Sequence, residues 1–297
     1  MMDGEWEWDK TLFGGSARYY RAGRFSYPAE LATAFQEELG LDGRGRLLDV
    51  GSGTGQVALL LAPLYEEVVG LDADEDMIAE AREEARRQGP RNTTWVNARA
   101  EELPLDLGTF RTATFAQSFH WMHREHVATT VFEMLEPNGA WVHVDTKTHR
   151  GAASDEQLSH LQPPRGEIEE LVRRYLGPVK RAGKGTLPGG TPSGESEIMV
   201  AAGFAGPRRR VLDSSRVFER SEDEIVASIF SVSSSAPHLF GSRLAEFERD
   251  MRQVLRRVSP GGRFCESSEK IQLIIWTRPA DDPVAGRKKP PPTEACS

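Results

Sequence analysis

A glycine-rich loop near residue 50 is the segment of this sequence most able to bind a ligand. Residues 47–50 are apolar except for Asp49, and Gly51, Gly53 and Gly55 follow at alternate positions. Gly51 permits a sharp turn, and the two later glycines have no Cβ to keep a ligand away from the backbone. Such a loop between a strand and a helix indicates a nucleotide-binding turn, although a purely structural turn has the same composition.

An acidic residue at the end of the next apolar run strengthens this interpretation. Asp72 follows residues 68–71 and lies about 20 residues after the first glycine, where a carboxylate meets the ribose hydroxyls of a bound nucleotide. The loop reads Gly-x-Gly-x-Gly, whereas the pyrophosphate-binding form reads Gly-x-Gly-x-x-Gly. A ligand with a ribose and no pyrophosphate fits this difference, and S-adenosylmethionine is such a ligand.

Aromatic and imidazole side chains follow the fourth predicted strand. Because ligands in open α/β sheets bind beyond the carboxyl ends of the strands, Phe119, His120, Trp121 and His123 are predicted to line the acceptor site. A neutral imidazole at His120 can take the proton of a hydroxyl or amine nucleophile. The alternative is a hydrogen-bonded wall residue, with Trp121 in the core. No cluster of carboxylates or cysteines accompanies these histidines, so no metal site is predicted.

The elements that must position these residues alternate between strands and helices. Short apolar or β-branched runs predict strands at residues 47–50, 68–71, 94–98, 112–117 and 140–144. Helical patterns lie between them at residues 56–63, 75–87 and 125–135. This alternation predicts an α/β fold with a parallel sheet covered on both faces.

The second half of the chain has a different pattern. Residues 155–176 predict a helix broken by Pro163 and Pro164, and the Gly- and Pro-rich residues 183–194 predict a mobile loop. Residues 208–218 and 270–277 predict strands, and residues 221–231 and 243–258 predict helices. Residues 279–297 lack apolar periodicity and predict a disordered tail.

Taken together, residues 19–144 resemble the class I S-adenosylmethionine-dependent methyltransferases. The resemblance is to the small-molecule branch that contains ubiquinone-biosynthesis-type and trans-aconitate-type enzymes. It implies a Rossmann-like, mostly parallel sheet with a late antiparallel strand and a helical cap insertion. It also implies an enzyme that transfers a methyl group from S-adenosyl-L-methionine to O, N or C of a small molecule, a secondary metabolite of natural product biosynthesis, leaving S-adenosyl-L-homocysteine.

The resemblance also implies a set of cofactor-binding residues. Residues 17–28 resemble an entrance segment whose aromatic and Arg side chains fold over the cofactor, with Tyr20 facing the acceptor; the alternative is aromatic packing with the Arg exposed. Asp49 orients the cofactor ammonium or the loop, or is a buried acid that fixes loop amides. Arg99 stands where the family often has Asp. The implied cofactor residues are Tyr19, Arg21, Asp49, Gly51, Ser52, Gly53, Gly55, Gln56, Asp72, Ala73, Met77, Ala100, Glu101 and Gln117.

The expected organisation has five parts. These are an N-terminal lid at residues 1–28, a cofactor-binding core at 29–149, a cap insertion at 150–206, the rest of the core with additional cap helices at 207–278, and the tail at 279–297. The acceptor is bound under the cap, and the sequence makes no prediction of oligomeric state.

Composition excludes several classes of protein. The chain has 297 residues and a net charge of −8 at pH 7, so it lacks the basic face that nucleic-acid binding needs. It has two cysteines, Cys265 and Cys296, an N-terminus without a signal-peptide pattern, and no apolar run longer than residues 57–62. A cytoplasmic protein without nucleic-acid or membrane partners is expected. A non-catalytic cofactor-binding scaffold or regulator is the main alternative, and a dehydrogenase is the third.

Overall fold

Five apolar runs of the first half and two strands of the second half form one seven-stranded sheet in the order β3-β2-β1-β4-β5-β11-β8. The first five strands in this order are parallel, and β11 runs antiparallel to both of its neighbours. The predicted Rossmann-like sheet with a late antiparallel strand is therefore confirmed. The strands are β1 (Arg46–Val50), β2 (Glu67–Asp72), β3 (Thr93–Asn97), β4 (Phe110–Ala116), β5 (Leu135–Asp145), β8 (Ala205–Leu212) and β11 (Ile271–Thr277).

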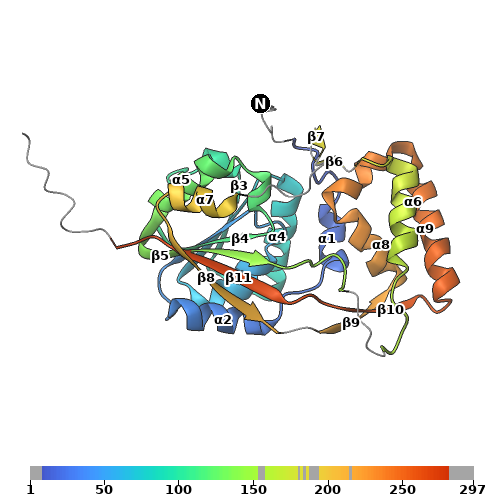
Figure 1. Cartoon of the computed structure of the whole chain (residues 1–297), viewed down its shortest axis with the longest axis horizontal. Helices are drawn as coiled ribbons and strands as arrows, with labels where there is room; N and C mark the ends of the chain where they lie inside the picture. The colour runs from blue at the N-terminus through green and yellow to red at the C-terminus, as the bar shows by residue number, and fades with distance from the viewer. Residues whose placement is uncertain are drawn as a thin grey trace, which may run out of the picture.

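The computed structural model describes residues 9–152, 158–179, 181–182, 185–186, 194–213 and 216–280. Figure 1 shows two lobes side by side, one built on the sheet and one built of helices. The predicted loop at residues 183–194 and the predicted tail lie largely outside the described residues. None of the helices in the described ranges is long and apolar enough to cross a membrane.

Helices cover both faces of the sheet because successive strand residues point to opposite sides. Leu47 packs in the apolar cluster formed with α2 (Ala29–Leu39) and α3 (Gln56–Leu61), whereas Leu48 packs in the cluster formed with α5 (Arg124–Met134) and α7 (Glu195–Ala201). The helix α4 (Glu75–Gln88) contacts β2 and β3.

The start of α4 is fixed by its N-cap. The Asp74 carboxylate accepts hydrogen bonds from the backbone amides of Asp76 at 2.9 Å and Met77 at 3.1 Å. An N-cap of this kind stabilises a helix by about 1 kcal/mol. It also determines where the residues that follow Asp72 lie.

The second lobe, here called the cap, has an apolar core of its own. It consists of α1 (Ala17–Gly23), α6 (Arg165–Leu176), α8 (Glu222–Phe230), α9 (Leu244–Val258) and the antiparallel pair β9 (Val217–Ser221) and β10 (Arg263–Ser267). Phe230, Phe247 and Phe264 are buried in this core. Two short strands, β6 (Arg181–Ala182) and β7 (Gly185–Thr186), pair with each other. The remaining elements are the 3-10 helices η1 (Ala62–Leu64), η2 (Ala100–Glu102), η3 (Phe119–Trp121), η4 (Ser233–Ser235) and η5 (Pro237–Arg243).

A buried ion cluster ties the parts of the cap together. The Glu266 carboxylate on β10 accepts bonds from Arg165 at the start of α6 and from Arg220 on β9, at 2.6 and 3.1 Å. It also accepts the backbone amide of Gly151, in the segment that leaves β5. Arg220 donates in turn to the Gly23 carbonyl at the end of α1. This cluster therefore connects five separate segments of the chain.

The second half departs from the sequence prediction in three respects. Residues 208–218 are not one strand, because β8 and β9 belong to different sheets. The helix predicted over 155–176 begins only at Arg165, immediately after Pro163 and Pro164. Proline is tolerated at the start of a helix and disfavoured in its interior. The predicted cap insertion at residues 150–206 is divided, because α6 packs in the cap whereas α7 packs on the sheet. The elements α1, α2 and β10 have no counterpart in the sequence prediction.

Candidate functional site

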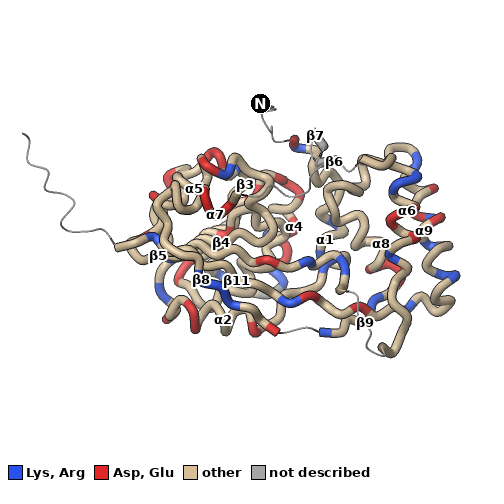
Figure 2. Tube along the Cα trace, viewed as in Figure 1, with Lys and Arg blue, Asp and Glu red and all other residues tan. Residues whose placement is uncertain are grey.

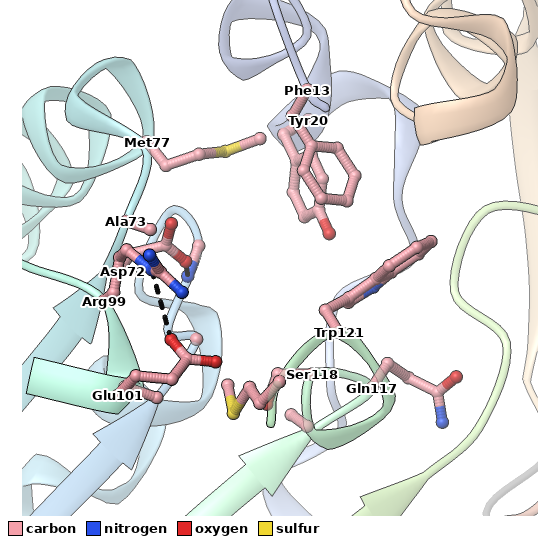
Figure 3. Close-up of a pocket in the computed structure, with 15 residues that line it drawn as sticks. Phe13, Tyr20, Asp72, Ala73, Met77, Arg99, Glu101, Gln117, Ser118 and Trp121 are labelled. Atoms are coloured by element: carbon pink, nitrogen blue, oxygen red, sulfur yellow. Dashed lines mark hydrogen bonds and ion pairs between the residues drawn. The ribbon is translucent and has the colours of Figure 1, made fainter. Parts of the chain in front are cut away.

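A cleft lies at the carboxyl ends of β1, β2 and β4, where the cap meets the sheet. Figure 3 shows its side chains arranged around an open centre, with Met77, Asp72 and Arg99 on one side and Tyr20, Phe13 and Trp121 on the other. The lining residues are Phe13, Tyr20, Gly51, Gly53, Asp72, Ala73, Met77, Arg99, Ala100, Glu101, Ala116, Gln117, Ser118, Trp121 and Met122.

The glycine loop forms the floor of this cleft, and two of its glycines are needed for close packing. A Cβ on Gly51 would lie 2.4 Å from the Cβ of Ser118, and a Cβ on Gly55 would lie 2.4 Å from the ring of Trp95. Both glycines also have a positive φ, of 70° and 80°, which other residues adopt only at a cost. Gly55 thus accommodates Trp95 and not a ligand. Gly53, by contrast, lines the cleft beside the ring of Tyr20.

Asp72, at the end of β2, holds the loop and still faces the cleft. One carboxylate oxygen accepts the Gly53 amide at 2.8 Å, and the other accepts the Asp74 amide at 2.9 Å. Burial raises the pKa of Asp72 to about 6, although these two amides oppose the rise. A carboxylate has about four acceptor positions, so each oxygen can still accept a bond from a ligand in the cleft.

Asp49 lies beneath the loop and does not line the cleft. One of its oxygens accepts the hydroxyl of Thr114 at 2.8 Å, and the other has no hydrogen-bond partner among the described residues. Burial raises the pKa of Asp49 to about 7. One predicted role for Asp49 is to accept hydrogen bonds from the backbone amides of the loop. In the structure the amides of Gly51 and Ser52 donate to the Leu71 carbonyl instead.

The two adjacent tyrosines of α1 point in different directions, one into the cleft and the other into the core of the cap. Consecutive helical residues point about 100° apart, so Tyr20 enters the cleft while Tyr19 packs on Phe230 in the cap, with ring centroids 5.0 Å apart. Phe13 joins Tyr20 and Trp121 through edge-to-face contacts at 6.4 and 6.2 Å. These three rings form one wall of the cleft (Figure 3).

The opposite wall contains an ion pair that the sequence analysis did not predict. Arg99 Nε lies 3.3 Å from Glu101 Oε2, and the other oxygen of Glu101 accepts the His123 amide at 2.8 Å. The guanidinium of Arg99 therefore lies along the cleft, as Figure 3 shows. The His123 side chain itself is exposed and faces His126.

Gln117 separates the cleft from a second cavity, here called the β5 cavity. Its backbone has a positive φ of 57°, and its side-chain amide donates to Asp145 Oδ1 at 2.7 Å. Such a conformation is uncommon outside glycine and is found where the surrounding structure imposes it. Gln117 and Ser118 line both the cleft and the β5 cavity, whereas His120 and Phe119 line only the latter.

His120 lies beside a residue of the cleft wall without lining the cleft itself. Its ring lies 4.7 Å from that of Trp121, centroid to centroid, and Trp121 lines the cleft. Burial lowers the pKa of His120 to about 4, so the imidazole is neutral near pH 7 and has a lone pair for a proton.

The structure brings together most, but not all, of the predicted site residues. Gly51, Gly53, Asp72, Ala73, Met77, Ala100, Glu101, Gln117, Tyr20 and Trp121 line the cleft. Tyr19, Asp49, Ser52, Gly55 and His123 do not line it. Arg21 and Gln56 line a separate hollow between the lobes, where Arg21 pairs with Glu84. Phe13, Arg99, Ala116, Ser118 and Met122 line the cleft without having been predicted to do so.

Comparisons with known proteins match the part of the chain that forms this cleft. Residues 47–139 match the family model of a methyltransferase domain. An uncharacterized methyltransferase of Bacillus subtilis is 29% identical over 163 residues, which are 52% of this chain and 61% of that protein. An uncharacterized methyltransferase of Mycobacterium bovis is 32% identical over 172 residues, or 57% and 61% of the two chains. A ubiquinone/menaquinone biosynthesis C-methyltransferase of a Geobacter species is 41% identical over 85 residues, or 27% and 36%.

The matched region of this chain is limited. It spans less than two thirds of the length of each of these relatives. The match to the family model nevertheless extends from β1 into β5 and includes the glycine loop, Asp72 and Glu101.

Proposed function

We propose, from the match of residues 47–139 to a methyltransferase domain, that the chain is a class I S-adenosylmethionine-dependent methyltransferase. In this proposal it transfers a methyl group from S-adenosylmethionine, bound in the cleft, to a small molecule. The observation that carries the proposal is the geometry of Asp72. Both of its oxygens are held by backbone amides, and each keeps acceptor capacity toward the cleft. A ribose diol presents two hydroxyl donors to such a carboxylate.

The rest of the cleft fits the other parts of this ligand. Met77, Ala73 and Ala100 provide an apolar surface beside Asp72 for a purine ring. The rings of Tyr20 and Trp121 lie across the cleft, where an aromatic face stabilises a positive charge such as a sulfonium. The small loop residues Gly51 and Gly53 leave room along the floor. Asp49 has one oxygen without a hydrogen-bond partner among the described residues. We propose that Asp49 acts on the amino-acid end of the cofactor only indirectly, through the glycine loop above it.

When bound, the cofactor supplies an electrophilic methyl group. The protein's residues then need only to bind the acceptor, align it and exclude water, and orientation of this kind supplies roughly 7–11 kcal/mol of barrier reduction. Where the acceptor loses a proton, His120 is the proposed base. Its imidazole is neutral near pH 7 and lies against Trp121 at the edge of the cleft.

Binding of the cofactor tests the proposal directly. We expect Asp72→Asn to weaken the affinity for S-adenosylmethionine and S-adenosylhomocysteine about 10- to 100-fold in calorimetry, since a hydrogen bond to a charged acceptor contributes about 1.5–3 kcal/mol. The matched control is Asp76→Asn, an exposed carboxylate in the first turn of α4 that does not line the cleft. Equal affinity of the folded Asp72 variant and the parent would refute the ribose assignment.

We propose that the acceptor is a small molecule of secondary metabolism and not a nucleic acid, and that the protein acts in the cytoplasm. The net charge of −8 supports this choice. Both signs of charge are distributed along both lobes (Figure 2). Incubation with labelled cofactor and either a metabolite extract or RNA distinguishes the two classes of acceptor.

A further inference from the structure

The β5 cavity lies next to the cleft, at the carboxyl ends of β4 and β5. The strands β4, β5 and β11 line it together with α5, and the first residue of α7, Glu195, closes one side. Its walls combine apolar side chains, among them Phe115, Phe119 and Ile274, with several titratable groups. Gln117 and Ser118 are shared with the cleft, so the two cavities meet along one wall.

A buried histidine with an unused donor faces this cavity. His143 is 7% exposed, and its Nε2 lies 2.7 Å from the indole nitrogen of Trp141. The indole N–H can only donate, so Nε2 is the acceptor and the imidazole proton lies on Nδ1. Among the described residues Nδ1 has no hydrogen-bond partner. Since Nε2 carries no proton in this tautomer, it has none to donate to a neighbouring carboxylate.

The same geometry leaves the Glu195 carboxylate able to accept a hydrogen bond from a ligand in the cavity. Glu195 Oε1 lies 3.2 Å from His143 Nε2, but that nitrogen already accepts the Trp141 proton. Burial also lowers the pKa of His143 to about 3, so the ring is neutral and the contact is not an ion pair. Glu195 therefore receives no hydrogen bond from His143.

A second carboxylate lies on the other side of the cavity. Asp145 accepts the Gln117 amide through Oδ1 at 2.7 Å, which leaves acceptor capacity on its other oxygen. Arg124 is the cation that lines the cavity with these two acids. The two lining carboxylates face one lining guanidinium, and Arg209, which lies outside the lining, also acts on Glu195. The lining itself therefore favours a cationic over an anionic ligand.

We propose that the β5 cavity binds the methyl acceptor and that this acceptor carries a primary amine, held as an ammonium by Glu195 and Asp145, next to an apolar body packed on Phe119 and Ile274. The inference rests on the proposed function, because the acceptor must meet the methyl group at the shared wall of Gln117 and Ser118. Glu195 is then the residue that determines acceptor specificity. It comes from α7, which lies in the segment predicted as cap.

The chemical step balances with the groups already named. The ammonium gives one proton to the neutral imidazole of His120, which passes it to water. The amine nitrogen then uses its lone pair to form a bond to the methyl carbon while the bond from that carbon to sulfur breaks. The electron pair of the broken bond stays on sulfur, which becomes a thioether, and the product is a protonated secondary amine.

Three probes of similar size test the charge preference. Phenethylamine, phenethyl alcohol and hydrocinnamate share a phenyl ring and a short chain and differ in their end group, which is cationic, neutral or anionic at pH 7. Calorimetry with the full chain, with and without saturating S-adenosylhomocysteine, is expected to give the tightest binding for the amine and the weakest for the acid. A preference for the alcohol or the acid, or no binding of the amine at millimolar concentration, would overturn the proposal.

Variants of α7 locate the site. Glu195→Gln keeps the size of the side chain and removes its charge, and we expect it to weaken phenethylamine binding about 10- to 100-fold while leaving phenethyl alcohol nearly unchanged. Glu197→Gln is the matched control, because Glu197 lies in the same turn, is exposed and does not line the cavity. Equal effects of both variants would overturn the assignment to Glu195.

Measurement of cofactor binding distinguishes failure of the proposed function from failure of the present inference. Affinity for S-adenosylhomocysteine is measured on the same Glu195 and Glu197 variants and is expected to be unchanged. Amine binding without any cofactor binding would contradict the proposed function and, with it, the role of the amine as methyl acceptor, while the cation site itself would stand. Cofactor binding without a preference for the amine would contradict only the present inference.

Discussion

Asp49 allows a quantitative test of the electrostatics beneath the glycine loop. The residue is 1% exposed, and burial raises its pKa from 3.8 to about 7, against the opposing effects of the Thr114 hydroxyl and the Ala58 amide. The folded protein therefore holds this proton more tightly than the unfolded chain does. Asp49 favours folding at low pH, and this contribution is lost as the pH rises from 3.8 toward 7.

The substitution Asp49→Asn removes the ionisation and keeps the oxygen that accepts from Thr114. A rise from 3.8 to about 7 corresponds to about 4 kcal/mol of destabilisation once the carboxyl is ionised in both states. Roughly 2–3 kcal/mol of this develops between pH 5 and pH 8.5. The new amide NH₂ takes the place of the oxygen without a partner and costs about 1–3 kcal/mol at every pH.

Urea unfolding of the parent and the variant at pH 5 and pH 8.5 measures this difference. The variant is expected to gain about 2–3 kcal/mol relative to the parent between these two pH values. Asp106→Asn is the control, because Asp106 is exposed and its substitution leaves the difference from the parent the same at both pH values. The same pH dependence for the Asp49 variant and the parent would refute the reasoning.

Two further predictions concern the cap and the acceptor site. Glu266→Gln leaves Arg165 and Arg220 without their shared counter-charge, so we expect a loss of about 3–5 kcal/mol in the free energy of unfolding. Denaturant unfolding measures this loss, and a value below about 1 kcal/mol would contradict the role of the ion cluster. His120→Ala is expected to lower kcat by about 10²–10⁴-fold with unchanged cofactor affinity, and because the pKa of His120 is lowered to about 4, the parent should lose activity through this group only as the pH falls toward 4. Steady-state kinetics with an identified acceptor measures both, and a reduction of less than about tenfold would mean that His120 lines the site without acting as a base.

The sheet and the glycine loop were predictable because their signals are local. Residues 47–50 form a buried run that is apolar except for Asp49, and three glycines follow it at alternate positions. The position of Asp72 follows from the end of the next strand. Local periodicity and the spacing of a loop motif are enough to establish such features.

The cap and half of the cleft wall depend on contacts that no local pattern encodes. Whether Tyr19 or Tyr20 enters the cleft is decided by the packing of α1 on α8, where Gly23 allows the backbone of Ala227 to approach closely. Glu195 reaches the β5 cavity because Met199, in the same helix, is buried in the core of the sheet lobe. Neither the phase of a short helix nor its docking site can be determined from seven residues of sequence.

The place of β11 in the sheet has a consequence for synthesis of the protein on the ribosome. β11 lies between β5 and β8 and pairs with both, yet it follows β8 along the chain. The edge of β5 therefore has no β11 to pair with until all residues from 146 to 270 have been synthesised. At ~5–20 residues per second this delay lasts on the order of ten seconds. During that time Trp141 and Val142 belong to a strand edge without its final partner, and such an edge favours association with other chains.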